Sequence, residues 1–188
     1  MTINANDIRV GHILEHEGRL WKVLKTMHTQ PGKGGAYMQV EMKDVRDGTK
    51  LNVRFRSSET VEKAHLDLRD CQFLYEDGEH LQVMDQESYE QMIISKDLIG
   101  EQLPFLQENM VIGIEFYEQE PVTVQLPETV VCTIAECEPV VKGQTAASSY
   151  KPAILDNKVR VMVPPFINVG DRVIVRVTDR QYIERAKD

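Results

Sequence analysis

Short stretches in which apolar and polar residues alternate run through the whole chain, and turn-forming residues separate them at close intervals. Residues 20–25 and 51–56 show this alternation, and the Asp77-Gly78 dipeptide is a favoured hairpin turn. No stretch approaches the roughly 18 apolar residues that a membrane-spanning helix needs. The pattern therefore predicts an all-β protein that is made of short hairpins and has no membrane segment.

Breaks in the pattern near residues 64 and 127 divide the 188-residue chain into three segments. We predict a small SH3-like barrel over residues 1–64, with its first strand at residues 8–10, followed by two five-stranded OB-folds over 65–127 and 128–188. A short helix is expected within residues 95–107. Barrels of about sixty residues lie near the lower limit for an independent core, so we expect the three to pack end to end.

The charge is unevenly distributed along the chain. The net charge is −8, and the three predicted segments carry +3, −12 and +1. Proteins that bind nucleic acid usually have a broad basic face, because neutralisation of phosphates supplies most of their affinity. An acidic middle between two mildly basic ends suggests a rod whose ends touch RNA. An acidic segment that only confers solubility explains the same charges equally well.

The three cysteines form no metal-binding or disulfide pattern. Cys71, Cys132 and Cys137 are odd in number and include no Cys-x-x-Cys pair, and the histidines have no ligand spacing with them. The five-residue spacing places Cys132 and Cys137 on opposite faces of a strand. We expect reduced, buried thiols without a metal or cofactor. No signal peptide is visible at the N-terminus, so we expect a cytoplasmic protein.

A glycine-rich segment between two predicted strands contains a single lysine, in the order Pro31-Gly32-Lys33-Gly34-Gly35. Glycine lacks a Cβ and proline fixes φ, so a narrow turn that presents Lys33 is favoured. The segment is no Walker-type phosphate loop, because that motif continues with Ser or Thr and a helix, whereas a strand follows here. From these residues alone, an ordinary flexible turn with a solvated lysine is the better explanation.

Four motifs change that balance when they are considered together. They are PGKGGAY at 31–37, GTKL with FRSSE at 48–51 and 55–59, YEDG at 75–78, and KPA with VPPFINVGD at 151–153 and 163–171. In their order and spacing these motifs resemble bacterial elongation factor P over essentially the whole chain.

The resemblance implies a non-enzymatic translation factor with three β-barrel domains in an elongated, tRNA-like arrangement. Members of that family bind the 70S ribosome between the peptidyl and exit sites, where they contact ribosomal RNA and relieve stalling at consecutive prolines. Lys33 would lie beside the CCA end of peptidyl-tRNA, presented by Pro31, Gly32, Gly34 and Gly35. The resemblance also implies a monomer and a modifying enzyme that extends Lys33 with an amine-bearing group.

The resemblance also assigns candidate RNA contacts near the C-terminus. Tyr182 and Arg185 match positions at the RNA-facing end of the family's third domain, although a tyrosine on a terminal strand is often explained by packing. Ser148, Ser149 and Tyr150 replace the glycines of a loop that in relatives approaches the exit-site codon. Tyr150 could either stack on a base or block a close approach, and both alternatives stay open.

Two other classes of protein compete with this interpretation. A general RNA-binding module of SH3 or OB type would carry aromatic residues beside basic ones, yet aromatic residues make up only 6% of the chain and are dispersed. An enzyme would need a convergent set of reactive groups, and Ser57-Ser58-Glu59 offers no pairing of that kind. Binding to ribosomes instead of free RNA would separate the factor from the general module.

Overall fold

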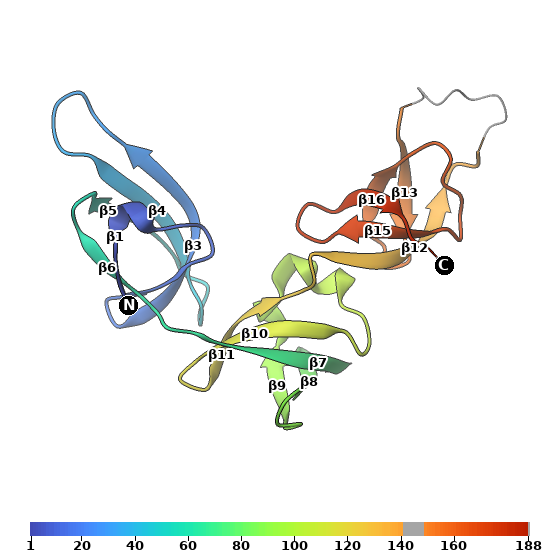
Figure 1. The fold of residues 1–188 in the computed structure, drawn as a ribbon, viewed down its shortest axis with the longest axis horizontal. Coiled ribbons are helices and arrows are strands. Elements are labelled where there is room, and N and C mark those ends of the chain that lie inside the picture. The colour runs from blue at the N-terminus through green and yellow to red at the C-terminus, as the bar shows by residue number, and fades with distance from the viewer. Residues whose placement is uncertain (141–148, 188) are drawn as a thin grey trace. The chain divides into compact units, whose positions relative to one another are not determined.

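The computed structural model describes residues 1–140 and 149–187, and it is almost entirely β. The described strands form one six-stranded and two five-stranded sheets (Figure 1). The chain divides into two compact units, Met1–Asp67 with Glu115–Val122, and Leu68–Ile114 with Thr123–Asp188. The prediction of an all-β protein with three small β domains is confirmed.

The first sheet has the strand order β1-β6-β2-β3-β4-β5. Its core contains Trp21, Val23, Val40 and Met42, which alternate with outward-facing residues on β3 and β4. The indole N–H of Trp21 donates to the His16 carbonyl at 3.0 Å, so the buried ring keeps its polar group bonded. The strands are β1 (Thr2–Asn4), β2 (Ile13–His16), β3 (Arg19–Thr29), β4 (Tyr37–Asp44), β5 (Lys50–Arg56) and β6 (Thr60–Lys63).

The prediction of a strand at residues 8–10 is wrong. The first strand is β1, and the 3-10 helix η1 (Ala5–Asp7) follows it. Ile8 is fully buried as a single apolar anchor, and the Arg9 guanidinium donates to the carbonyls of Asn6 and Ile8 at 2.7 and 2.9 Å. These local bonds hold the segment as a turn, so its alternation of apolar and polar residues does not reflect pairing with a neighbouring strand.

The middle sheet contains the five predicted strands in the order β11-β10-β7-β8-β9. Gly78 has φ of +60° in the turn between β7 and β8, a conformation that glycine adopts without strain. The helix expected within residues 95–107 is present as two short 3-10 helices, η2 (Lys96–Leu98) and η3 (Gly100–Phe105). The strands are β7 (Asp67–Asp77), β8 (His80–Asp85), β9 (Gln91–Ser95), β10 (Val111–Tyr117) and β11 (Glu120–Gln125).

The C-terminal sheet has the order β14-β13-β12-β15-β16. Its inward-facing residues are mostly valines, which suit a small and strongly curved sheet. The edge strands β14 and β16 contact each other, so the sheet curls toward closure. The strands are β12 (Thr129–Cys137), β13 (Lys151–Leu155), β14 (Arg160–Val163), β15 (Arg172–Arg176) and β16 (Gln181–Arg185).

Strand β12 contains an irregularity that overturns the prediction for its two cysteines. The pairing with β13 shifts between Ile134 and Glu136, and such a bulge changes the alternation of the residues that follow. Cys132 is 2% exposed and Cys137 is half-buried, and both pack against the same core. Burial raises the pKa of Cys71 and of Cys132 to about 11, so these thiols stay protonated at neutral pH.

Helix η3 supplies a residue to the core of the C-terminal sheet within the second unit. Phe105 is fully buried there, in one cluster with core residues of β12, β13, β14 and β15. Arg180 lies 5.8 Å from the centre of the Phe105 ring and donates to the Glu101 carbonyl at 2.8 Å. The Gln107 side-chain amide donates to the Val131 carbonyl at 2.8 Å. The segment before β10 therefore packs into the core of the C-terminal sheet and is hydrogen-bonded to it.

We expect Phe105→Ala to destabilise the C-terminal sheet by about 3–5 kcal/mol, because it leaves a cavity in a closely packed core. Hydrogen exchange of the amides in β12 and β15 measures this loss. Phe166→Ala is the matched control, since Phe166 is 53% exposed and its loss should change stability by less than about 0.5 kcal/mol. Equal protection in the two variants would contradict the role of Phe105.

Candidate functional site

The sequence-predicted lysine tip lies at the end of the hairpin formed by β3 and β4. The ladder between these strands ends at the pair Thr29 and Tyr37, which leaves residues 30–36 as the connecting loop. β3 has 11 residues and β4 has 8, so the loop projects beyond the rest of the first sheet (Figure 1). The pairing of β3 with β4 therefore positions whatever the loop presents.

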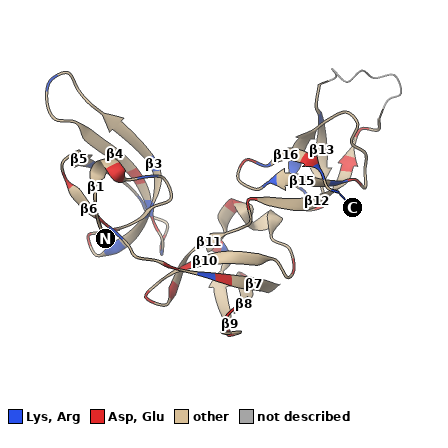
Figure 2. Ribbon diagram, in the orientation of Figure 1, with Lys and Arg blue, Asp and Glu red and all other residues tan. Residues whose placement is uncertain are grey.

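Lys33 is exposed at this tip and is the only charged residue in residues 30–36 (Figure 2). It makes no ion pair with any residue that the structure describes. Gly34 has φ of +110°, and a Cβ at this position would lie 3.9 Å from Pro31 Cγ. Gly32 and Gly35 have ordinary φ values and open space around them. The loop is thus a narrow support for one long cation.

The base of the loop is held by contacts between β4 and the segment after β5. The Ser57 amide donates to the Ala36 carbonyl at 3.0 Å, and the Arg54 guanidinium lies 4.3 Å from the centre of the Tyr37 ring. Arg56 pairs with Tyr37 in the ladder, which makes Arg54 its diagonal neighbour on the same face. Cation–π contacts of this kind are worth about 0.5–1 kcal/mol when exposed.

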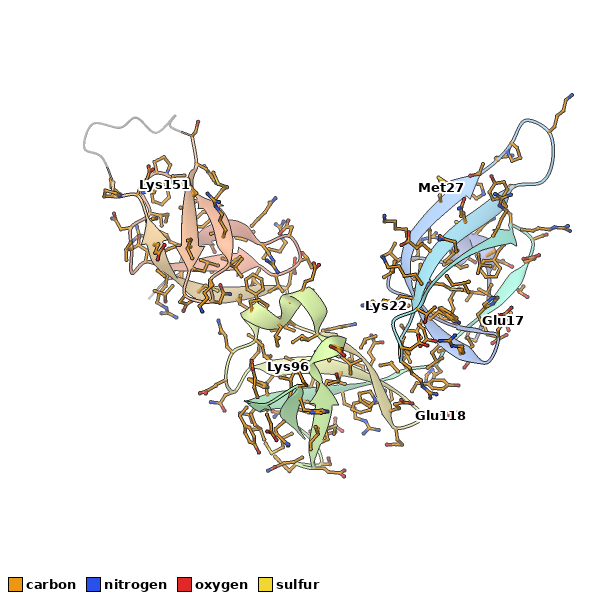
Figure 3. The ribbon with its side chains drawn as sticks, turned by 180° about the vertical axis from the view of Figure 1, so that it is seen from behind. Glu17, Lys22, Met27, Lys96, Glu118 and Lys151 are labelled. Carbon is orange, nitrogen blue, oxygen red and sulfur yellow. The ribbon has the colours of Figure 1, made fainter. Side chains whose placement is uncertain are left out.

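No local pattern in the sequence predicts this stacked pair, because the register between β4 and β5 brings the two residues together. Arg54 and Arg56 are both exposed and lie at the end of β5 that is nearest to the loop. Exposed Met27 is on the strand that leads into the loop (Figure 3). The hairpin end therefore combines three cations, including Lys33, with apolar surface. Such a surface can contact a phosphate backbone and the sugars or bases beside it.

The structure provides no convergent set of catalytic groups at this end. Ser57 Oγ lies 3.4 Å from His28 Nε2, a long contact on an exposed surface. No carboxylate orients the imidazole among the residues that the structure describes. Within the same residues, no cluster of His, Cys, Asp and Glu could hold a metal ion. Among residues 1–140 and 149–187, no helix is long and apolar enough to span a membrane.

The candidate RNA contacts near the C-terminus lie in the second unit. The rings of Tyr150 and Tyr182 meet edge to face, with centroids 6.5 Å apart and an interplanar angle of 84°. Arg185 is exposed at the end of β16. Ser149 is exposed beside Tyr150, and Ser148 lies outside the described residues. Burial is the main cause that raises the pKa of Tyr182, and the electrostatic effect of nearby Tyr150 adds to it.

Family comparisons cover nearly the whole chain. Residues 4–61 match the elongation factor P (EF-P) KOW-like domain, 66–124 match its OB domain, and 130–185 match its C-terminal domain. Elongation factor P of Erythrobacter litoralis is 58% identical over 99% of this chain and 100% of the relative, and that of Zymomonas mobilis is 59% identical over the same shares.

The fold also resembles that of a solved structure at low sequence identity. Eukaryotic translation initiation factor 5A from Methanococcus jannaschii superposes with a TM-score of 0.52 at 23% identity, covering 68% of this chain and 92% of that one. This likeness concerns the fold alone.

We expect Gly34→Ala to lower the free energy of unfolding of the first sheet by about 1–2 kcal/mol, because alanine is strained at this φ. Trp21 is the only tryptophan and lies in this core, so its fluorescence during urea unfolding measures the loss. Gly32→Ala and Gly35→Ala are the controls and should change the value by less than about 0.5 kcal/mol. Three equal effects would contradict a special role for Gly34.

Proposed function

Since the chain belongs to the elongation factor P family and is a translation elongation factor that works with the ribosome, we propose that it relieves stalling at consecutive prolines. It binds between the peptidyl and exit sites and stimulates peptide-bond formation by positioning peptidyl-tRNA through the loop that carries Lys33. The observation that carries the proposal is one exposed lysine on a projecting loop with little side-chain bulk.

The physical task is to align two reacting ends. Proline reacts through a secondary amine and constrains the chain that carries it, so donor and acceptor meet in poor geometry. A cation placed among the phosphates of the CCA end would hold the donor in an attack geometry. Positioning of reactants supplies up to about 7–11 kcal/mol in the best cases, and this reaction needs only part of that.

The hairpin suits this task in shape and in charge. Residues 31–36 of its loop have no long side chain other than Lys33, so the tip can enter a space that is lined by RNA. An ammonium group is a compact charge with three donors, which suits phosphate oxygens approached from several directions. The contact of Arg54 with Tyr37 and the bond from Ser57 to Ala36 support the base of the loop.

The remaining parts of the proposal concern partners and organisation. Peptidyl-tRNA and ribosomal RNA are the direct partners, and Tyr182 and Arg185 contact RNA from the C-terminal domain. The factor acts as a cytoplasmic monomer, and it is no enzyme, because its effect comes from positioning and not from a reactive group of its own. The domain boundaries lie near residues 64 and 127.

A modifying enzyme extends Lys33. The positive charge of the lysine needs no modification, but a longer side chain does, because only an added group can lengthen it.

We expect Lys33→Ala to abolish the stimulation of a reporter with consecutive prolines in reconstituted translation, because the variant removes the positioning cation. Its unfolding curve, followed by Trp21 fluorescence, should match that of the protein without the substitution, since Lys33 makes no contact in the first core. Lys50→Ala is the control, because it removes an exposed lysine at the opposite end of β5 from the loop. If Lys33→Ala stimulated the reporter fully, the result would contradict the proposal.

We expect intact protein from its native host to be heavier than its sequence, with the increment on the peptide that contains Lys33. Mass spectrometry of the whole protein and of its peptides measures this and identifies the added group. The lysines at positions 25 and 50 provide internal controls, since they are exposed but lie outside the glycine loop. An unmodified Lys33 would refute the proposed modifying enzyme.

A further inference from the structure

We propose that strand β9 of the middle sheet binds an extended segment of a basic protein, which joins the sheet as a further strand. β9 lies at one edge of this sheet, next to β8, and no other strand among the described residues pairs with it (Figure 1). An unpaired edge strand presents a row of backbone donors and acceptors to which a strand of another chain can bond. The inference goes beyond the proposed function, which gives the middle sheet no role.

The ladder between β8 and β9 shows which backbone groups of β9 face outward. The Asp85 amide donates to the Glu90 carbonyl at 2.9 Å, and the Lys96 amide donates to the Glu79 carbonyl at 3.0 Å. The register between these two bonds is regular, and hydrogen-bonded pairs alternate along an antiparallel ladder, so the even-numbered residues of β9 bond to β8. The odd-numbered residues direct their N–H and C=O groups away from β8. These residues are Gln91, Ile93 and Ser95.

The other sheet edges have features that discourage pairing with a second chain. The first sheet ends on one side in β1, which has three residues, and on the other in β5, where Lys50, Arg54 and Arg56 are exposed. β11, the second edge of the middle sheet, contains Pro121, which lacks an N–H. The edge strands β14 and β16 of the C-terminal sheet contact each other. β9 has neither a charge nor a proline, so its edge is open to pairing.

An uncharged row of side chains crosses the sheet and ends at this edge. The register places Tyr75 of β7 opposite Gln82 of β8, and Gln82 opposite Ile93 of β9, so the three side chains lie on one face. Tyr75 is 54% exposed and Ile93 is 57% exposed. An added strand would place a side chain beside Ile93, and apolar neighbours across two strands stabilise a sheet. The row therefore offers an incoming strand apolar contact in addition to backbone bonds.

The charges around β9 favour a basic partner. The segment 65–127 has a net charge of −12. Glu87 and Glu90 are exposed before β9 and Asp97 is exposed after it, and no cation among the described residues pairs with them. Lys96, which directly follows β9, is held by Glu76 at 2.9 Å. Lysine or arginine side chains at the ends of an added strand would therefore meet uncompensated carboxylates.

A second copy of this chain suits the edge less well. Pairing of β9 with β9 would bring together two segments that each have a net charge of −12, and like charges repel. The complementary occupant is a strand with apolar residues in its middle and basic residues at its ends.

The test uses the full-length, isotope-labelled protein and a synthetic peptide in which valine and threonine alternate between two lysines at each end. A second peptide has the same sequence but carries N-methyl groups on its central amides, so it cannot donate backbone bonds there. In NMR titrations the first peptide should shift the amide signals of Gln91, Ile93 and Ser95 and slow their hydrogen exchange. It should bind about ten-fold more tightly than the methylated peptide, the scale of one or two backbone hydrogen bonds.

Two substitutions of Ile93 separate the backbone bonds from the apolar contact. Ile93→Pro removes the central outward N–H and should abolish binding, while unchanged hydrogen exchange of the Leu81 and Val83 amides should show an intact ladder. Ile93→Thr keeps the N–H but removes apolar surface, so binding should weaken about three-fold. Val111→Thr is the matched control, because Val111 is 46% exposed on β10, an interior strand, and it should bind like the unaltered protein.

The acidic residues before β9 provide a separate test of charge. Glu87→Gln combined with Glu90→Gln should weaken binding of the lysine peptide about two- to five-fold, the scale of exposed ion pairs. Glu108→Gln combined with Glu128→Gln is the control, because it removes two exposed carboxylates from the segments before β10 and β12. This control should leave the affinity unchanged.

Three results would overturn the proposal. Equal binding of the methylated and unmethylated peptides would mean that no strand is added. Equal binding of a peptide with glutamates in place of its lysines would mean that charge does not select the partner. A dimer that forms without peptide and is dissociated by Ile93→Pro would make a second copy the occupant. Lys33→Ala should bind the lysine peptide normally, so a failure at β9 and a failure of the lysine loop give different results.

Discussion

The antiparallel ladder between β3 and β4 is the constraint on which the proposed function depends. It buries Trp21 and Val23 on one side and continues to the pair Thr29 and Tyr37, where the loop begins. The register of this ladder fixes where Lys33 emerges. A slip of one residue would move every side chain of the slipped strand to the other face and expose its core residues. The burial that stabilises the first sheet therefore also positions the lysine.

Charge is used sparingly in this acidic chain. Among the described residues, Lys33 at the glycine loop makes no ion pair, whereas Arg19 and Arg46, which lie before and after β4 in the same unit, are held in ion pairs. A protein with a net charge of −8 cannot rely on general attraction to RNA. It can contact RNA where local geometry leaves a cation free, and this arrangement disfavours indiscriminate binding.

Several features were predictable because they depend on neighbours in the sequence. Alternation predicted the all-β fold, and the run of glycines located the loop that carries Lys33. The errors arose where local patterns are ambiguous. Residues 8–10 alternate like a strand but turn around the buried Ile8, and the bulge in β12 brought Cys137 to the same core as Cys132.

The fold class and the chemistry of the loop follow from the amino-acid order alone, since side-chain period and the absence of a Cβ act over a few residues. Three other features arise only in the folded chain: Phe105 belongs to the C-terminal core, Arg54 stacks on Tyr37, and Tyr150 meets Tyr182. Each of these contacts joins residues from different strands or segments. They depend on strand order and register, which result from the packing of the whole sheet and leave no local signal in the chain.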